Sequence, residues 1–235
     1  MELAKKVLTG DVLSAARLIR CLEDEIEGAS EGLDELYLHT GHAQIIGITG
    51  APGAGKSTIV GCLIGHFRQL QNTVGVVAVD PSSPFSGGAI LGDRVRMQAY
   101  GGDKDVFIRS LASRGWKGGL SRATLSTVHV MDAMGKDVII IEAVGSGQAD
   151  IDIARISDTV ILVLNPGAGD EVQMMKAGIL EAADIFVINK ADMAGADRFK
   201  LSLDSMLAMS PRGRKYGEWK PPVIMAERSM WLFSV

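Results

Sequence analysis

Five short runs rich in β-branched residues alternate with helical stretches from residue 43 onward, and this alternation limits the folds open to the chain. Each run is continuously apolar rather than alternating in polarity, as in strands that helices cover on both faces. The pattern therefore predicts an α/β fold with a mostly parallel central sheet and helices on both faces. The predicted strands are Gln44–Thr49, Thr73–Val79, Val138–Glu142, Thr159–Leu164 and Ile185–Ile188.

The first forty residues lack such runs. Their apolar side chains recur at helical spacing, and Asp11 is placed to cap the start of a second helix. We expect a helical extension over 1–40, an α/β domain over 41–223 and a separate tail over 224–235.

The composition is that of an ordinary globular protein, because 47% of the 235 residues are apolar and 22% are charged. A net charge of −4 without long basic runs argues against nucleic-acid binding. Two cysteines exclude a disulfide framework, and the first residues lack the apolar core of a signal peptide. No apolar run approaches the roughly 20 residues that cross a membrane. We therefore expect a cytoplasmic protein without a membrane partner.

The segment after the first predicted strand matches G-x-x-x-x-G-K-[ST], the pattern of a phosphate-binding loop. In such a loop, backbone N–H groups turn inward around phosphate and the next helix directs its positive end to the same place. We expect Lys56 to reach the β- and γ-phosphates and the Ser57 hydroxyl to bind Mg²⁺. The fold class is therefore a three-layer P-loop NTPase. The predicted nucleotide contacts are Gly50, Ala51, Pro52, Gly53, Ala54, Gly55, Lys56, Ser57 and Thr58.

A second motif, Asn189-Lys190-Ala191-Asp192, follows the last predicted strand and matches the N-K-x-D pattern of guanine-nucleotide proteins. The Asp192 carboxylate can accept hydrogen bonds from guanine N1–H and its 2-amino group. Adenine has no matching donors and would leave the carboxylate unsatisfied, which discriminates strongly between the bases. Asn189, Lys190 and Asp192 therefore predict GTP rather than ATP as the ligand.

Two acidic segments also follow predicted strands. Glu142 opens a segment that reaches Gly145, where many GTPases have D-x-x-G with the acid near Mg²⁺ and the glycine amide at the γ-phosphate. Gly145 is therefore a predicted nucleotide contact, and the Glu142 carboxylate could orient or activate the attacking water. A strand-end salt bridge is the alternative for Glu142. Asp80 opens a Ser- and Gly-rich loop that reaches Asp93, and two acids there suit a Mg²⁺ environment. A surface loop with capping acids is the alternative for that pair.

With these motifs in place, the chain resembles the MeaB/MMAA/ArgK family of P-loop GTPases over about Leu13 to Val223. The segments that carry the resemblance surround the phosphate-binding loop and the strand ends, and they are more specific together than the loop alone. They are Gly47–Gly50, Val79–Pro84, Ile90–Arg94, Glu142–Gln148, Pro166–Gln173 and Lys176–Gly178.

The resemblance implies a G-protein chaperone that uses GTP, GDP and Mg²⁺. Its client would be an adenosylcobalamin-dependent acyl-CoA mutase, usually methylmalonyl-CoA mutase, whose cofactor loading it gates and which it protects. The resemblance further implies that Asp80 and Asp93 belong to the Mg²⁺ environment and that Glu142 positions or activates water. The stretch from Asn165 to Lys176 would be an extra switch that communicates with the mutase, and Lys176 is a cation that this switch could bring to the site.

The resemblance does not extend to the last residues. The family continues with a guanine-contacting loop and a helical dimerisation arm, whereas the stretch from Ile224 to Val235 does not match it. From this we expect a truncated or replaced C-terminus, weakened guanine affinity and a homodimer that is absent or altered.

Two other functions stay open from the sequence. One is an ArgK-type protein kinase that uses the same loop with Asp80 as the base, and the other is a nucleotide-binding remnant with little turnover. A metal-insertion GTPase has no support, because four scattered histidines supply no ligand set.

Overall fold

A seven-stranded sheet forms the centre of the computed structural model, which describes residues 2–80, 100–112, 122–143, 148–167, 179–209 and 219–227. Its strand order is β3-β2-β4-β1-β5-β6-β7, and every pair is parallel. The predicted parallel α/β fold is therefore confirmed. The strands are β1 (Gln44–Gly50), β2 (Val74–Asp80), β3 (Val106–Ala112), β4 (Val138–Glu142), β5 (Thr159–Leu164), β6 (Ile185–Asn189) and β7 (Val223–Ala226).

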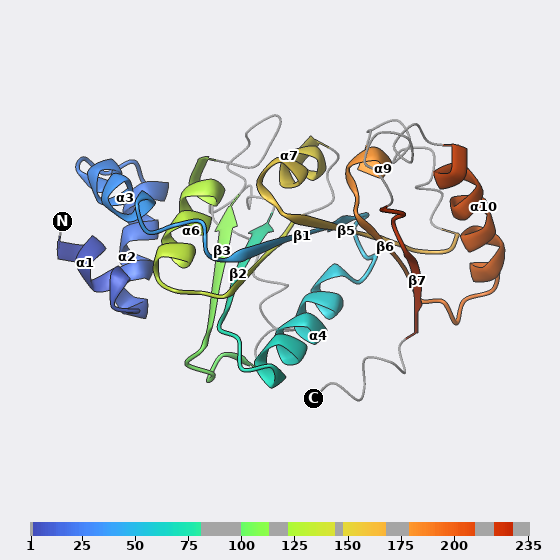
Figure 1. Cartoon of the computed structure of the whole chain (residues 1–235), viewed down its shortest axis with the longest axis horizontal. Helices are drawn as coiled ribbons and strands as arrows, with labels where there is room; N and C mark the ends of the chain where they lie inside the picture. Colours follow the sequence, from blue (N-terminus) through green and yellow to red (C-terminus); the bar gives the residue numbers. More distant parts are fainter. Residues whose placement is uncertain are drawn as a thin grey trace, which may run out of the picture.

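Helices cover both faces of this sheet (Figure 1). Helix α4 (Lys56–Gln69) packs on one face, against the inner strands. The other face carries α6 (Arg122–Ala133), α7 (Gln148–Ile156), α9 (Ile179–Ala182) and α10 (Ala196–Met209). None of the helices in the described part of the chain is long and apolar enough to span a membrane.

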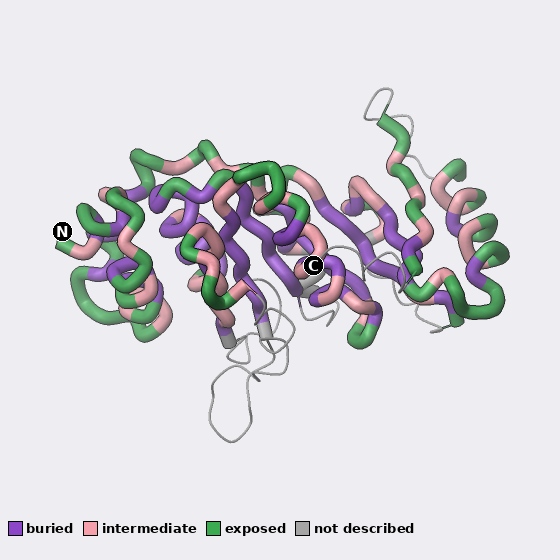
Figure 2. Tube along the Cα trace, turned by 90° about the horizontal axis from the view of Figure 1, so that it is seen from below, coloured by how far each residue is buried: buried purple, intermediate pink, exposed green. Residues whose placement is uncertain are grey.

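Strand β4 shows why the runs are continuously apolar. Val138 and Ile140 join the core beneath α4, whereas Ile139 and Ile141 join the core on the opposite face. Successive side chains of a strand point to opposite faces, so a strand with two buried faces is apolar at every position. All five residues of β4 are buried, and Figure 2 shows the strands as the buried centre of the molecule.

The sequence predicted five of the seven strands and missed β3 and β7. Strand β3 contains Arg109 and Ser110, which break the apolar run, and it lies at an edge of the sheet. Strand β7 has only four residues and follows two prolines. It pairs with β6, so Ile224, Met225 and Ala226 belong to the sheet although the sequence analysis placed them in a tail. Its register places Ala226 opposite Asn189.

The first three helices form one unit, which we call the N-terminal helical unit: α1 (Glu2–Leu8), α2 (Val12–Glu23) and α3 (Ala29–Tyr37). The predicted cap is confirmed, because the Asp11 carboxylate accepts the Ser14 N–H at 2.8 Å. The apolar side chains of this unit share a core with α6, and an ion pair joins Glu23 of α2 to Arg109 of β3. In Figure 1 the unit lies beyond α6, at the end of the molecule opposite α10.

Carboxylates satisfy backbone N–H groups at the edge of the sheet where the strands begin. Buried Asp132 of α6 accepts hydrogen bonds from the N–H groups of Gly41, His42 and Ala43, at 2.6, 3.2 and 3.0 Å. These three residues connect α3 to β1. A single buried carboxylate therefore fixes the entry into the central strand.

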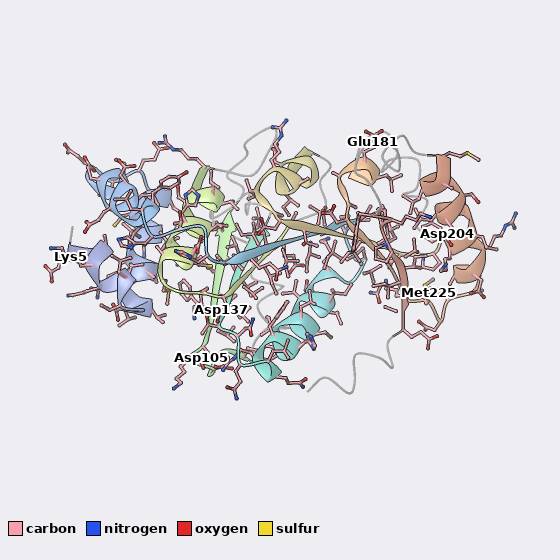
Figure 3. The ribbon with its side chains drawn as sticks, viewed as in Figure 1. Lys5, Asp105, Asp137, Glu181, Asp204 and Met225 are labelled. Carbon is pink, nitrogen blue, oxygen red and sulfur yellow. The ribbon has the colours of Figure 1, made fainter. Side chains whose placement is uncertain are left out.

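A charged cluster lies at the same edge, at the start of β3 and β4 (Figure 3). Asp137 accepts the Thr73 N–H at 2.7 Å. The Arg68 guanidinium donates to Asp103 at 2.8 Å and to Asp105 at 2.7 Å. Its hydrogen bond holds the pKa of the Asp103 carboxyl below the ordinary value. These side chains bind one another and the backbone, so the polar groups at this edge of the sheet are satisfied by contacts within the protein.

Candidate functional site

The opposite edge, where the strands end, holds the phosphate-binding loop between β1 and α4. Gly50, Gly53 and Gly55 have φ angles of 143°, 76° and 97°, a region that other residues rarely adopt. A Cβ at Gly50 would overlap the carbonyl of Val163, and one at Gly55 would overlap the amide of Asn189. Gly50 and Gly55 are therefore required by both backbone conformation and space, whereas Gly53 is required by its conformation alone.

Lys56 lies inside this loop. The residue is 7% exposed, and its ammonium donates to the carbonyls of Gly50 at 2.9 Å and Ala51 at 3.1 Å. Ala51, Pro52, Gly53 and Ala54 form the curve of the loop, and Ser57 and Thr58 lie in the first turn of α4. The cation is thus held by two backbone carbonyls at the place where the motif predicts phosphate.

Ser57 contacts the end of β4. Its hydroxyl donates to Glu142 Oε1 at 2.7 Å, and both side chains are buried. The parallel register places Glu142 opposite Ile48 of β1, two residues before the loop begins. The two motifs, 85 residues apart in the sequence, therefore meet through one hydrogen bond. A hydroxyl beside a carboxylate is a set of hard oxygen donors, which is the chemistry that Mg²⁺ prefers.

The N-K-x-D segment lies on the other side of the loop. Asn189, the last residue of β6, is buried and donates from Nδ2 to the carbonyl of Ala54 at 2.7 Å. Lys190 has a φ of 56° and donates from Nζ to the carbonyl of Gly53 at 3.0 Å. Asp192 is exposed in the turn that follows. The motif thus binds the loop with its first two residues and presents its acid to solvent.

Two more residues reach this edge of the sheet. The Asn165 side chain, just after β5, lies 3.3 Å from the carbonyl of Gly53. The carbonyl of Ala226, at the end of β7, accepts the N–H of Ala191 at 3.0 Å. The sequence analysis did not place β7 beside the N-K-x-D segment. The available signal was the short apolar run Val223–Ala226 after two prolines.

The other predicted site residues are placed only in part. Asp80 is the last residue of β2, so its backbone lies at the same edge, although its side chain is outside the described set. Asp93, Gly145 and Lys176 lie outside the described residues. Among the residues that the structure describes, no three His, Cys, Asp or Glu side chains group closely enough to hold a metal ion.

Comparisons with known proteins agree with this geometry. The family profile described as methylmalonyl-CoA mutase-associated GTPase MeaB matches residues 15–230. A protein of Pyrococcus abyssi, provisionally named a GTPase, is 50% identical over 230 residues, which cover 97% of this chain and 71% of that protein. The GTPase ArgK of Escherichia coli is 38% identical over 195 residues, which cover 82% of this chain and 58% of ArgK.

A solved structure is similar over almost the whole chain. It is named as an LAO/AO transport system kinase, and it matches with a TM-score of 0.75 and 27% sequence identity. The match covers 98% of this chain and 69% of the kinase structure. The arrangement of strands and helices described above is therefore shared with a solved structure.

Proposed function

The chain belongs to the MeaB family of methylmalonyl-CoA mutase-associated GTPases, and on that premise we propose that its GTP hydrolysis serves an adenosylcobalamin-dependent acyl-CoA mutase. The protein is a P-loop GTPase that binds guanine nucleotides. The proposal adds that it acts as a chaperone, gating cofactor loading and protecting the mutase, most directly methylmalonyl-CoA mutase. The cytoplasm is the location that this proposal implies.

The hydrogen bond between Ser57 and Glu142 carries the assignment of the site. It joins the P-loop helix to the end of the neighbouring strand in a buried environment. In phosphoryl-transfer sites of this class, a P-loop hydroxyl and a strand-end carboxylate hold the metal beside the β- and γ-phosphates. We assign Glu142 to the side of the site where Mg²⁺ would bind, with Ser57. Asp80 and Asp93 complete the proposed metal environment.

Bound Mg²⁺ would neutralise charge that develops on the β- and γ-phosphate oxygens. The residues of the chain do the remaining work. Lys56 would exchange its two carbonyl contacts for phosphate oxygens, while the loop N–H groups hold the rest of the triphosphate. Glu142 would also orient the attacking water, whose oxygen bonds to the γ-phosphorus as the bond to the bridging oxygen of GDP breaks. The proton of the water passes to the released phosphate or to solvent.

Guanine selectivity is assigned to the N-K-x-D segment. Asn189 and Lys190 hold the loop carbonyls, and the exposed Asp192 is available to guanine N1–H and the 2-amino group. The segment from Asn165 to Lys176 is proposed as the switch that reaches the mutase, with Lys176 as a cation supplied to the transition state. Slow turnover without the partner follows, because no such cation is then held at the γ-phosphate.

The direct test combines the purified protein with adenosylcobalamin-dependent methylmalonyl-CoA mutase from the same organism. We expect a stable complex and GTP hydrolysis that is faster than that of either protein alone. Lys176→Ala should bind the mutase and lose most of the acceleration, whereas Lys200→Ala, on α10, should keep it. A mutase that neither binds nor changes hydrolysis would contradict the chaperone proposal and leave the GTPase itself in place.

Phosphoryl transfer to an acceptor protein is the second candidate, favoured by the similarity to a structure named as a kinase. The same loop would bind the donor and Asp80 would take the proton of the acceptor hydroxyl. With GTP labelled in the γ-phosphate, hydrolysis predicts label only in inorganic phosphate. Label that stays on a protein band after denaturing electrophoresis would support the kinase.

A further inference from the structure

The charge of the chain is concentrated in its first forty residues. Residues 1–40 hold nine of the 28 acidic side chains and four of the 24 basic ones, a net charge of −5. Residues 41–235 hold the other 19 acids and 20 bases, a net charge of +1. The N-terminal helical unit therefore carries the negative charge of the whole protein, and the GTPase domain is nearly neutral.

The acids of this unit gather around α3. No Lys or Arg occurs from Cys21 to Gly55. In the described part of the chain, two acids of this stretch form ion pairs. Glu23 pairs with Arg109, and Asp24 pairs with Arg20. Five others have no cationic partner there: Glu25, Glu27, Glu31, Asp34 and Glu35. Among the residues that the structure describes, no Lys or Arg therefore relieves the mutual repulsion of these five acids.

Helix stability does not explain this pattern. Glu31 lies in the first turn of α3, where negative charge interacts favourably with the helix dipole. Asp34 and Glu35 lie in the second half of a nine-residue helix, where the dipole disfavours them. The acids do not form a chelating group either, because the described residues include no set that could hold a metal.

Apolar side chains share the outward face of α3 with these acids. The inward face is formed by Ala29, Gly32 and Leu36, which are buried. Tyr37 and Leu38 follow Asp34 by three and four residues, a spacing that places them on the same side of the helix as Asp34 and Glu31. Tyr37 is 60% exposed and Leu38 is 83% exposed. We call this surface, made by Glu31, Asp34, Tyr37 and Leu38, the α3 face. In Figure 2 the helices next to the N-terminus show exposed outer sides over a buried inner side.

The α3 face is held firmly on the GTPase domain. The ring of Tyr37 packs edge-on against His129 of α6, with 5.2 Å between ring centroids. Just after α3, the buried Asp132 carboxylate fixes the backbone of Gly41, His42 and Ala43. A partner that binds this face would therefore be positioned relative to the sheet.

We propose that the α3 face is a docking surface for the mutase, which would present a Lys- and Arg-rich surface with an apolar hollow for Leu38. This inference rests on the proposed function and names where the client binds. Complementary charge favours a basic protein surface. Nucleic acids and anionic membranes are repelled by an acidic face. By net charge, a second copy of this chain brings another acidic unit or a domain of charge +1, so it complements the α3 face less well than a basic partner does.

The test measures association of the full chain with the mutase by surface plasmon resonance over a range of salt concentrations. Glu31→Lys combined with Asp34→Lys should slow association about tenfold or more at low salt and remove most of its salt dependence. Leu38→Ser should instead accelerate dissociation. Both variants should fold and hydrolyse GTP at the unstimulated rate, because the changed side chains are exposed and lie outside the nucleotide site.

The matched control reverses the same number of charges on α10, at the other end of the molecule, with Asp197→Lys and Asp204→Lys. It should associate nearly as the unmodified protein does. Equal loss in the α10 control, or unchanged kinetics in the α3 variants, would overturn the docking surface while the mutase proposal stands. Absence of any complex with the unmodified chain would overturn both.

Discussion

The two edges of the sheet, where strands begin and where strands end, differ in the side chains that satisfy their backbone groups. Where strands begin, their N–H groups need acceptors, and carboxylates such as Asp132 and Asp158 supply them. Where strands end, loop carbonyls need donors, and Lys56, Asn189 and Lys190 supply them. Only the second arrangement can be exchanged for a ligand, because phosphate oxygens can replace carbonyls as acceptors for the same ammonium. We therefore assign a structural role to the first edge and propose that the second edge binds the nucleotide.

The largest effect is expected from Lys56→Ala at the edge where strands end. We expect the Lys56 ammonium to stabilise the γ-phosphate in the transition state, so its removal should lower hydrolysis by about 10²–10³-fold or more. Single-turnover hydrolysis of GTP measures the loss.

Lys200→Ala is the control for the Lys56 variant, because Lys200 pairs with Asp204 on the surface of α10. It should hydrolyse GTP at the unmodified rate. Hydrolysis that survives in Lys56→Ala would mean that nucleotide is processed elsewhere.

Asp132→Ala breaks the structural edge. Three backbone N–H groups lose one buried acceptor, and hydrogen bonds to a charged group contribute about 1.5–3 kcal/mol, so unfolding should require about that much less free energy. Urea denaturation measures it, and GTP affinity of the folded protein should stay unchanged.

Asp204→Ala is the surface counterpart of that variant. Its partly exposed ion pair with Lys200 should contribute at most about 0.5 kcal/mol. If Asp132→Ala and Asp204→Ala lowered the free energy of unfolding equally, the buried Asp132 carboxylate would be no more important for stability than an ordinary surface charge.

Glu142→Gln tests the edge of the sheet where the strands end. An amide can still accept the Ser57 hydroxyl but carries no charge for the metal environment, so Mg²⁺ affinity of the GTP complex should fall about 10–100-fold. Magnesium titration of hydrolysis gives the midpoint. Binding of GDP without Mg²⁺ should change little, and an unchanged magnesium midpoint would remove Glu142 from the metal side of the site.

The smallest effect concerns pH at the α3–α6 contact. Burial lowers the pKa of His129, and the neighbouring Asp132 carboxylate opposes the shift. The unfolded chain then takes up a proton first, at its ordinary pKa of about 6.5. Stability from this group is complete above about pH 6.5 and declines as pH falls toward the lowered value.

His129→Gln should flatten this decline in the free energy of unfolding, whereas His39→Gln, at an exposed position, should not. Denaturation curves between pH 5 and 8 compare the two variants. Parallel curves for His129→Gln and the unmodified protein would show that this group does not titrate as burial requires.

The sequence predicted the parts of the fold in which local pattern and burial agree. The continuous apolar runs of β1, β2, β4, β5 and β6 have two covered faces, so their composition identified them. The edge strands β3 and β7 were not predicted. Arg109 and Ser110 interrupt the apolar run of β3, and β7 is only four residues long. Spacing alone gave Asp11 as a cap, because that contact is local.

The sequence predicted the site as a set of separate motifs. It could not predict the long-range contacts between those motifs. That Ser57 meets Glu142, and that Asn189 holds Ala54, depends on strand order, which no single motif contains. Asp132 was not singled out at all, because a carboxylate inside a helix gives no signal of the distant backbone that it binds. The roles of Asp80, Asp93, Gly145 and Lys176 remain predictions.

Isothermal titration calorimetry with GDP, GTP, ADP and ATP in the presence of magnesium tests the central claim most directly. The arrangement of the loop, Lys56 and the N-K-x-D segment predicts saturable binding of both guanine nucleotides, with adenine nucleotides weaker by at least about 100-fold. Absence of heat with GDP and GTP, or equal or tighter binding of ADP, would contradict the account.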